Sequence, residues 1–174
     1  LDAAGNTTNA ASEANVMNIL NNASILGDVN NIYLNIGWTF PSFSDEDIAS
    51  LSAFMDAGGN VFMAGQDIAW DILSGDGYGT PAAIAFMANY MNAQYVADGG
   101  TSNSQLTAVA TDVFFGGVPN SSIVDVYAGN MYPDELTPIN GAEAIFNYNG
   151  NASKVGGIRF NNGISKMVYI GVGL

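Results

Sequence analysis

The stretch 44–64 constrains the fold most, because it carries both ends of a helix and the strand that follows it. Ser44 precedes the acidic run 45–47, an order typical of a capped helix whose first turn carries negative charge. The Gly pair at 58–59 supplies a left-handed stop, and residues 61–64 form a near-continuous apolar run. The sequence therefore predicts a helix that leads into a strand buried on both faces.

Helical and strand patterns alternate along the rest of the first half. Residues 32–36 have the composition of a buried strand, and a short helix is expected over 67–73. Two further helices are expected, one over 12–27 and one from 80 to about 95. This alternation is typical of an α/β fold with a parallel sheet.

The second half is richer in Gly and Asn and has the composition of strands. Asn161-Asn162-Gly163 predicts a hairpin turn, since Asn and Gly accept positive φ. No linker or internal repeat divides the chain, so we expect one domain over residues 1–174, with a mostly parallel sheet and a C-terminal antiparallel hairpin. The strands expected in this half cover 106–113, 123–127, 143–148, 155–160 and 166–172.

The composition excludes several classes of function. The chain has no histidine and no cysteine, so most acyl-transfer, redox and transition-metal chemistry lacks a residue to carry it. Sixteen acidic side chains face only three basic ones, Lys154, Arg159 and Lys166, and the net charge of −13 disfavours nucleic acids and anionic membranes as partners. No apolar run of about 18 residues occurs, so membrane insertion is not expected. The absence of Cys fits a secreted protein of this size.

The segment 42–73, SFSDEDIASLSAFMDAGGNVFMAGQDIAWDIL, resembles the glutamine-amidotransferase-like (class I) domains of secreted bacterial multidomain proteins. Residues 32–37 and 167–173 are similar to two further strands of that family. The resemblance implies a flavodoxin-like three-layer sandwich. It also implies that the chain, which begins at Leu1, is an excised or processed part of a longer one.

The same resemblance places Met63 at the position of the family's catalytic cysteine, when Gly65 is aligned with the glycine of the Cys-x-Gly pattern. A thioether has no ionisable proton and cannot attack an amide carbonyl. No histidine is present to act as a base. The resemblance therefore implies a scaffold without catalytic activity.

Four aromatic residues, Trp38, Phe40, Trp70 and Tyr78, lie at or near predicted strand ends and loops. Aromatic rings at such places can stack on sugar rings, and they can equally fill the core around the loops. The sequence leaves both interpretations open.

Asp67, Asp71 and Asp76 lie beside Gly-rich turns, where carboxylates can bind Ca²⁺. However, no Asp-x-Asp-x-Asp-Gly loop is present. Helix capping explains Asp67 equally well, and solvation explains Asp76. No cofactor is expected, since the glycine-rich loop 74–79 lacks a P-loop lysine and no Ser/Thr-rich flavin phosphate loop occurs. N-glycosylation sequons begin at Asn6, Asn22, Asn120 and Asn151.

These observations predict a non-catalytic structural, assembly or adhesion module of a secreted or cell-surface protein, with a filament-forming subunit as the boldest form of that role. The expected partners are further copies of the chain or other domains of the same parent protein. Two alternatives stay open: a carbohydrate-binding module, whose partner is a glycan, and a hydrolase that uses carboxylates alone.

Overall fold

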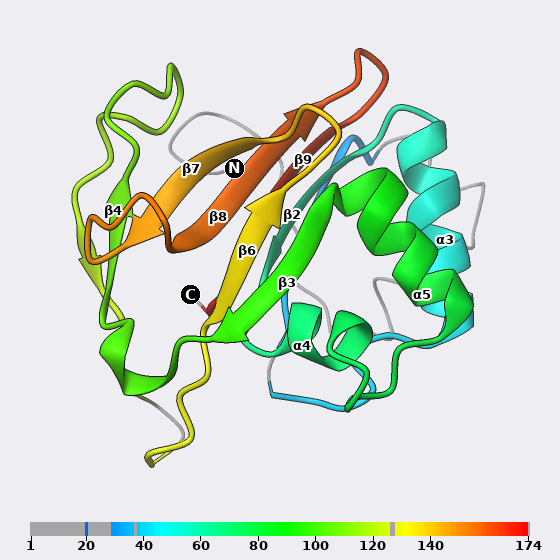
Figure 1. Ribbon diagram of the computed structural model, residues 1–174. Coiled ribbons are helices and arrows are strands. Elements are labelled where there is room, and N and C mark those ends of the chain that lie inside the picture. Colours follow the sequence, from blue (N-terminus) through cyan, green and yellow to red (C-terminus); the bar gives the residue numbers. More distant parts are fainter. Residues whose placement is uncertain (1–19, 21–28, 37, 126–127, 174) are drawn as a thin grey trace.

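The computed structural model describes residues 20, 29–36, 38–125 and 128–173, and strands dominate it (Figure 1). The helix expected over 12–27 lies outside the described residues, apart from the buried Leu20. The described elements are β1 (Asn31–Asn35), α3 (Asp45–Asp56), β2 (Asn60–Ala64), α4 (Ile68–Leu73), α5 (Pro81–Phe86), the π-helix η1 (Met87–Met91), β3 (Ala93–Asp98), the 3-10 helix η2 (Gly100–Ser102), β4 (Gln105–Ala108), β5 (Ser121–Ser122), β6 (Asp134–Pro138), β7 (Glu143–Tyr148), β8 (Val155–Asn161) and β9 (Lys166–Ile170).

The strands form one mixed sheet of nine strands. Its order is β1-β2-β9-β8-β7-β4-β5, and β6 pairs with both β8 and β3. The pairs β1–β2 and β2–β9 are parallel, whereas the other pairs among the described strands are antiparallel. Figure 1 shows α3, α4 and α5 gathered beside β2 and β3, while β4, β7 and β8 curl away from them.

The predicted fold class is wrong. We expected a flavodoxin-like α/β sandwich with a mostly parallel sheet, and the structure has many strands, few helices and a largely antiparallel sheet. Parallel neighbours need a crossover of about a dozen or more residues, and the turns that join β6, β7, β8 and β9 are shorter than that. Two of these turns join antiparallel neighbours: β7 pairs with β8, and β8 pairs with β9 around Asn161-Asn162-Gly163.

The helix predicted after Ser44 is confirmed as α3. The Ser44 hydroxyl accepts a hydrogen bond from the Asp47 N–H at 3.2 Å, and the Asp47 carboxylate accepts one from the Ser44 N–H at 2.9 Å. This reciprocal pair is a capping box, which satisfies two backbone donors at the start of the helix. After the helix, Gly59 lies against the Phe54 ring, so closely that a Cβ there would lie 2.3 Å from ring carbons.

The helix predicted from 80 to about 95 ends early. α5 begins after the capping residue Thr80 and continues as η1 to Met91. The next residue, Asn92, adopts a left-handed φ of 50° and ends the helix. Ala93 then begins β3, which the sequence did not predict. β3 pairs with β6, a strand far away in the sequence, and a local sequence pattern cannot predict such a partner.

β2 is covered on both faces, as its apolar run predicts. Met63 is fully buried in the larger core cluster, which also holds Leu51 of α3 and Ile68 of α4. Its neighbour Ala64 belongs to a second cluster together with Ile170 of β9. Successive residues of a strand face opposite sides of the sheet, so β2 contributes to both clusters. Met63 is therefore a packing residue of the core.

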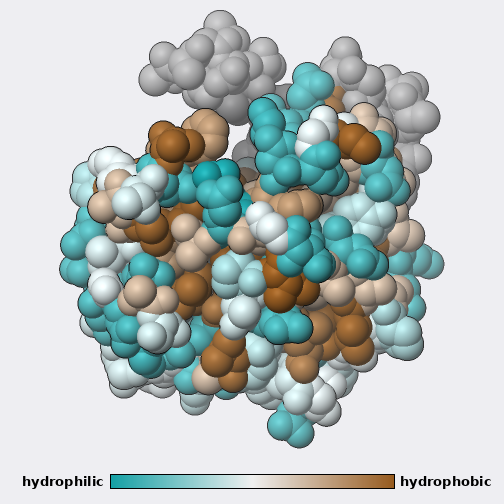
Figure 2. Space-filling view, turned by 45° about the horizontal axis from the view of Figure 1, so that its top comes forward, coloured by the Kyte–Doolittle hydropathy of each residue, from teal (hydrophilic) through white to brown (hydrophobic). Residues whose placement is uncertain are grey.

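Apolar side chains also reach the surface, in separate groups. Val113 and Phe114 are among the most exposed large apolar residues. Figure 2 shows several small hydrophobic groups separated by hydrophilic residues, without one broad patch over the described atoms of that face. No helix within the described ranges is long and apolar enough to span a membrane.

Gly79 provides a test of how the loop 74–79 packs on α4. A Cβ at Gly79 would lie 2.0 Å from the carbonyl oxygen of Ile72, whereas Gly117 has no heavy atom within 4 Å of its Cβ position. We expect Gly79→Ala to lower the free energy of unfolding by about 1–3 kcal/mol, because the loop must move. Gly117→Ala should leave it equal or slightly higher. Urea denaturation measures both, and equal stability of the two variants would contradict this packing.

Candidate functional site

Carboxylates and aromatic rings meet where β1 and β2 end. Trp38 follows β1, and Asp67 follows β2. Asp98 is the last residue of β3 and pairs with Asp134, the first residue of β6. Ligands of α/β sheets commonly bind at the carboxyl ends of parallel strands. This end of the sheet is therefore the candidate site.

Three of these residues bring their carboxylates together. Asp67, Asp98 and Asp134 each offer an oxygen atom, and the three atoms lie within 4.8 Å of one another. Burial, followed by the nearby charge of Asp98, raises the pKa of Asp67 to about 7, although a hydrogen bond with Trp38 opposes the shift. Asp98 is exposed, but partial loss of solvent around its carboxylate still raises its pKa, against the hydrogen bond that the Tyr95 hydroxyl donates at 2.9 Å. The group therefore holds a proton more tightly than isolated carboxylates do.

Asp134, the first residue of β6, caps the start of α4 with its side chain. Its carboxylate accepts hydrogen bonds from the N–H groups of Ala69 at 2.8 Å and Trp70 at 3.2 Å, and from the Tyr169 hydroxyl at 3.0 Å. Because Asp134 is completely buried, its pKa is raised well above the usual range, even though these hydrogen bonds oppose the shift.

Helix capping, one of the two explanations that the sequence offered for Asp67, is wrong for its side chain. Asp67 occupies the N-cap position, but its side chain makes no capping hydrogen bond, and its backbone adopts a left-handed φ of 62°. Non-glycine residues adopt this conformation infrequently, with Asn and Asp the most tolerant. The carboxylate of Asp67 is consequently directed to the neighbouring acids and Trp38.

Three of the four predicted aromatic residues come together with Tyr132 to form an aromatic cluster. The ring centroids of Trp38 and Phe40 lie 6.2 Å apart, those of Phe40 and Trp70 5.5 Å apart, and those of Trp38 and Tyr132 6.2 Å apart. Trp38, Phe40 and Tyr132 are each 37% exposed, so they are not core residues. Tyr78 is more exposed and lies on the loop after α4, outside these ring contacts.

Buried polar residues fix the loops that carry the aromatic cluster. Asp71 accepts hydrogen bonds from the N–H groups of Ser42 at 2.7 Å and Tyr78 at 3.0 Å. Gln66 donates to the carbonyl oxygen of Asn130 at 3.0 Å and accepts from the Tyr132 N–H at 3.4 Å. Two side chains from the region after β2 therefore position Phe40 and Tyr132, which lie far apart in the sequence.

The structure does not bring the predicted metal ligands together as a set. Asp71 is buried, and its carboxylate accepts hydrogen bonds from backbone N–H groups. Asp76 is exposed on the loop 74–79. Asp67 instead lies with Asp98 and Asp134, but the oxygens of Asp134 already accept three hydrogen bonds. Asp67 and Asp98 alone offer far fewer oxygens than the 6–8 that Ca²⁺ usually takes.

The other predicted positions lie elsewhere. Asn120 and Asn151 are exposed and lie outside the helices and strands, while Asn6 and Asn22 lie outside the described residues. Asp98, Asp134 and Tyr132 were missed by the sequence analysis, because β3 and β6, which position the two acids, were not predicted as strands. Asp98 precedes a Gly-Gly pair, which is the one local sign of a strand end there.

No protein-family model matches the chain, and no curated protein matches its sequence. Solved structures share its fold, among them the following two. Exo-beta-1,4-mannosidase Op5Man5 from Opitutaceae bacterium strain TAV5 has a TM-score of 0.52 and 13% identity, and the match covers 84% of this chain but only 21% of the enzyme. The mmIFT52 N-terminal domain has a TM-score of 0.50 and 12% identity, with 87% of this chain and 69% of that domain covered.

These comparisons correct the resemblance drawn from the segment 42–73. Neither similar structure nor any family model supports a glutamine-amidotransferase-like domain, and the strand-rich sheet also differs from the one that the resemblance implies. The assignment of Met63 to a nucleophile position loses its basis. At these identities the two solved structures are informative about the fold alone.

The raised pKa of Asp67 predicts how stability depends on pH. Between its ordinary pKa of 3.8 and about 7, the folded chain keeps a proton that the unfolded chain has lost, so stability falls as the pH rises through this window. We expect Asp67→Asn to flatten this fall by on the order of 2 kcal/mol, after allowance for solvent screening. Asp76→Asn, on an exposed loop, is the control and should keep the wild-type profile. Urea denaturation from pH 4 to 8 measures all three proteins, and identical profiles for wild type and Asp67→Asn would contradict the prediction.

Proposed function

We propose that the chain is a non-catalytic module that binds glycans and thereby attaches a secreted or cell-surface protein to carbohydrate. The observation that carries the proposal is the aromatic cluster of Trp38, Phe40, Trp70 and Tyr132, which is partly exposed and lies beside Asp67 and Asp98. The wider structural and filament-forming roles expected from the sequence stay predictions.

The chemistry of a sugar ring fits such a surface. One face of a pyranose presents C–H groups that pack on aromatic rings, and its edge presents hydroxyl groups that hydrogen-bond to carboxylates. The half-buried rings lose little conformational freedom on binding, because Asp71 and Gln66 already hold their loops. The net charge of −13 favours neutral or amino sugars over anionic ones.

A carboxylate-only glycoside hydrolase is the second candidate, and one specific observation favours it. Asp67 has a pKa of about 7, which suits a general acid near neutral pH, and the exposed Asp98 lies close to it. The same glycan that binds would then be cleaved. Reducing ends released from that glycan by the wild type, but not by Asp67→Asn, would favour the hydrolase over the binding module.

A glycan array followed by fluorescence titration tests the proposal. Both tryptophans of the chain belong to the aromatic cluster, so intrinsic fluorescence reports on the site directly. We expect Trp38→Ala to weaken glycan binding about tenfold or more, because a central aromatic contact contributes more than about 1 kcal/mol. Tyr33→Ala is the matched control, since Tyr33 is an exposed aromatic residue in the middle of β1 and its ring lies against that of Phe62.

Two outcomes would contradict the proposal. The first is an array without any bound glycan. The second is equal affinity of the wild type and Trp38→Ala for a glycan that does bind, with Tyr33→Ala causing the loss instead.

A further inference from the structure

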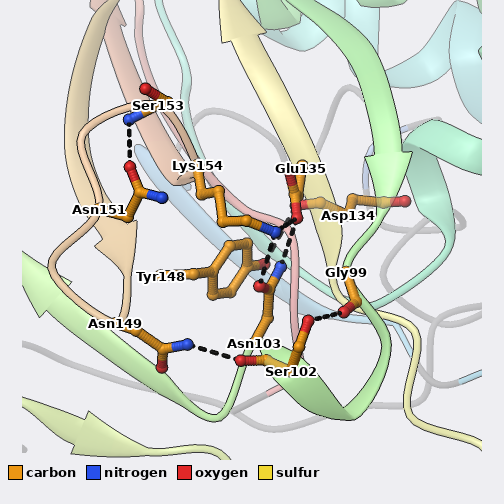
Figure 3. A network of polar contacts seen from close by, with 10 residues as sticks. All are labelled: Gly99, Ser102, Asn103, Asp134, Glu135, Tyr148, Asn149, Asn151, Ser153 and Lys154. Atoms are coloured by element: carbon orange, nitrogen blue, oxygen red, sulfur yellow. Dashed lines mark hydrogen bonds and ion pairs between the residues drawn. The ribbon is translucent and has the colours of Figure 1, made fainter.

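A lysine, an asparagine and a glutamate meet outside the aromatic cluster (Figure 3). Asn103 lies between η2 and β4, Glu135 is the second residue of β6, and Lys154 directly precedes β8. Asn103 is completely buried and Glu135 nearly so, while the Lys154 side chain is 36% exposed. Lys154 is one of only three basic residues in the chain, and it lies beside a nearly buried carboxylate.

The carboxylate of Glu135 contacts the side-chain nitrogen of Lys154 and the side-chain nitrogen of Asn103. Its Oε1 lies 2.5 Å from Lys154 Nζ and accepts a hydrogen bond from Asn103 Nδ2 at 3.0 Å. Lys154 Nζ also lies 3.4 Å from Asn103 Oδ1, the oxygen bonded to the carboxamide carbon. An amine, an amide carbonyl and a group that can move protons between them are therefore in mutual contact (Figure 3).

We propose that Lys154 and Asn103 join through an intramolecular isopeptide bond, with Glu135 as the acid–base group. The Lys154 ammonium gives a proton to Glu135, and the free Nζ lone pair attacks Cγ of Asn103. The Cγ–Nδ2 bond then breaks while Glu135 returns its proton to Nδ2. The departing ammonia takes up the remaining amine proton, so one ammonium ion leaves, one amide replaces another, and no oxidant or cofactor is needed.

The surroundings hold the two reacting groups in place. Asn103 packs so closely on Gly99 that a Cβ at Gly99 would lie 1.7 Å from Asn103 Nδ2. The backbone of Lys154 is fixed in a turn, because its N–H donates to Asn151 and its carbonyl accepts from Tyr148, both across short distances of 2.9 and 2.8 Å. Groups that are held together without freedom to separate react at high effective concentration.

The Glu135 carboxylate lies beside a completely buried residue. Tyr148 is completely buried, and its pKa is raised first by burial and then by the charges of Asp134 and Glu135, so the Glu135 carboxylate faces a poorly solvated region. An ordinary ion pair would need no buried carboxamide in contact with both partners.

The bond would tie the start of β4 to the start of β8, two strands that are separated in the sheet by β7. It would close a long loop of the chain, which restricts the unfolded state in the way that a disulfide does. The chain has no cysteine and cannot form a disulfide. An isopeptide bond would restrain it covalently and would not depend on redox conditions.

Intact-mass measurement of the full purified chain, incubated at neutral pH for several days, tests the proposal. We expect a mass lower than that of the sequence by one ammonia, and a cross-linked peptide containing Asn103 and Lys154 in tandem mass spectra of a digest. A wild-type chain of full mass after this incubation would overturn the proposal, and this reading requires no variant to fold.

Variants assign the ammonia loss to this site. Lys154→Arg keeps the positive charge and Glu135→Gln keeps the shape, and both should show the full mass. Lys166→Arg, at an exposed position of β9, should keep the deficit. Succinimide formation at an Asn-Gly pair such as Asn162-Gly163 also loses ammonia, so a deficit that persists in Lys154→Arg would overturn the proposal. For folded Lys154→Arg, we expect a Tm lower by roughly 10 °C.

Discussion

The carboxylate of Asp134 accepts hydrogen bonds from the first turn of α4 and from the Tyr169 hydroxyl of β9. Its own backbone is equally well held, because its N–H donates to the Gly171 carbonyl and its carbonyl accepts from the Tyr148 hydroxyl. One buried residue thus joins β6, α4, β7 and the end of β9. Such a network is costly if only partly satisfied, and here Asp134 has partners for both carboxylate oxygens.

The site of the aromatic cluster and the site of Lys154 share the strand β6. Asp134 and Glu135 are neighbours on β6, and successive strand residues face opposite sides, so their carboxylates point away from each other (Figure 3). Asp134 holds α4, which carries Trp70 of the aromatic cluster, and lies beside Asp67 and Asp98. Glu135 contacts Asn103 and Lys154. The placement of β6 in the sheet therefore determines both arrangements.

Local sequence patterns were sufficient for elements whose stability is local. The capping box of Ser44 and Asp47, the apolar run of β2 and the Asn-Gly turn before β9 all depend on residues close together in the sequence. β3 and β6 depend on each other across a long separation, and β6, with the sequence DELTP, has little strand character of its own. The fold class and the acids Asp98 and Asp134 could not be predicted for that reason, whereas Trp38, Phe40 and Trp70 could.

Amide hydrogen exchange measured by NMR tests most directly whether Asp134 holds the start of α4. In Asp134→Asn, the amide group offers one acceptor oxygen in place of two, so at least one of the Ala69 and Trp70 amides should exchange about tenfold faster or more, in line with the cost of about 1–3 kcal/mol for a buried donor that loses its acceptor. The Leu51 amide inside α3 should keep its wild-type exchange rate. Unchanged protection of both Ala69 and Trp70 would contradict the central role given to Asp134.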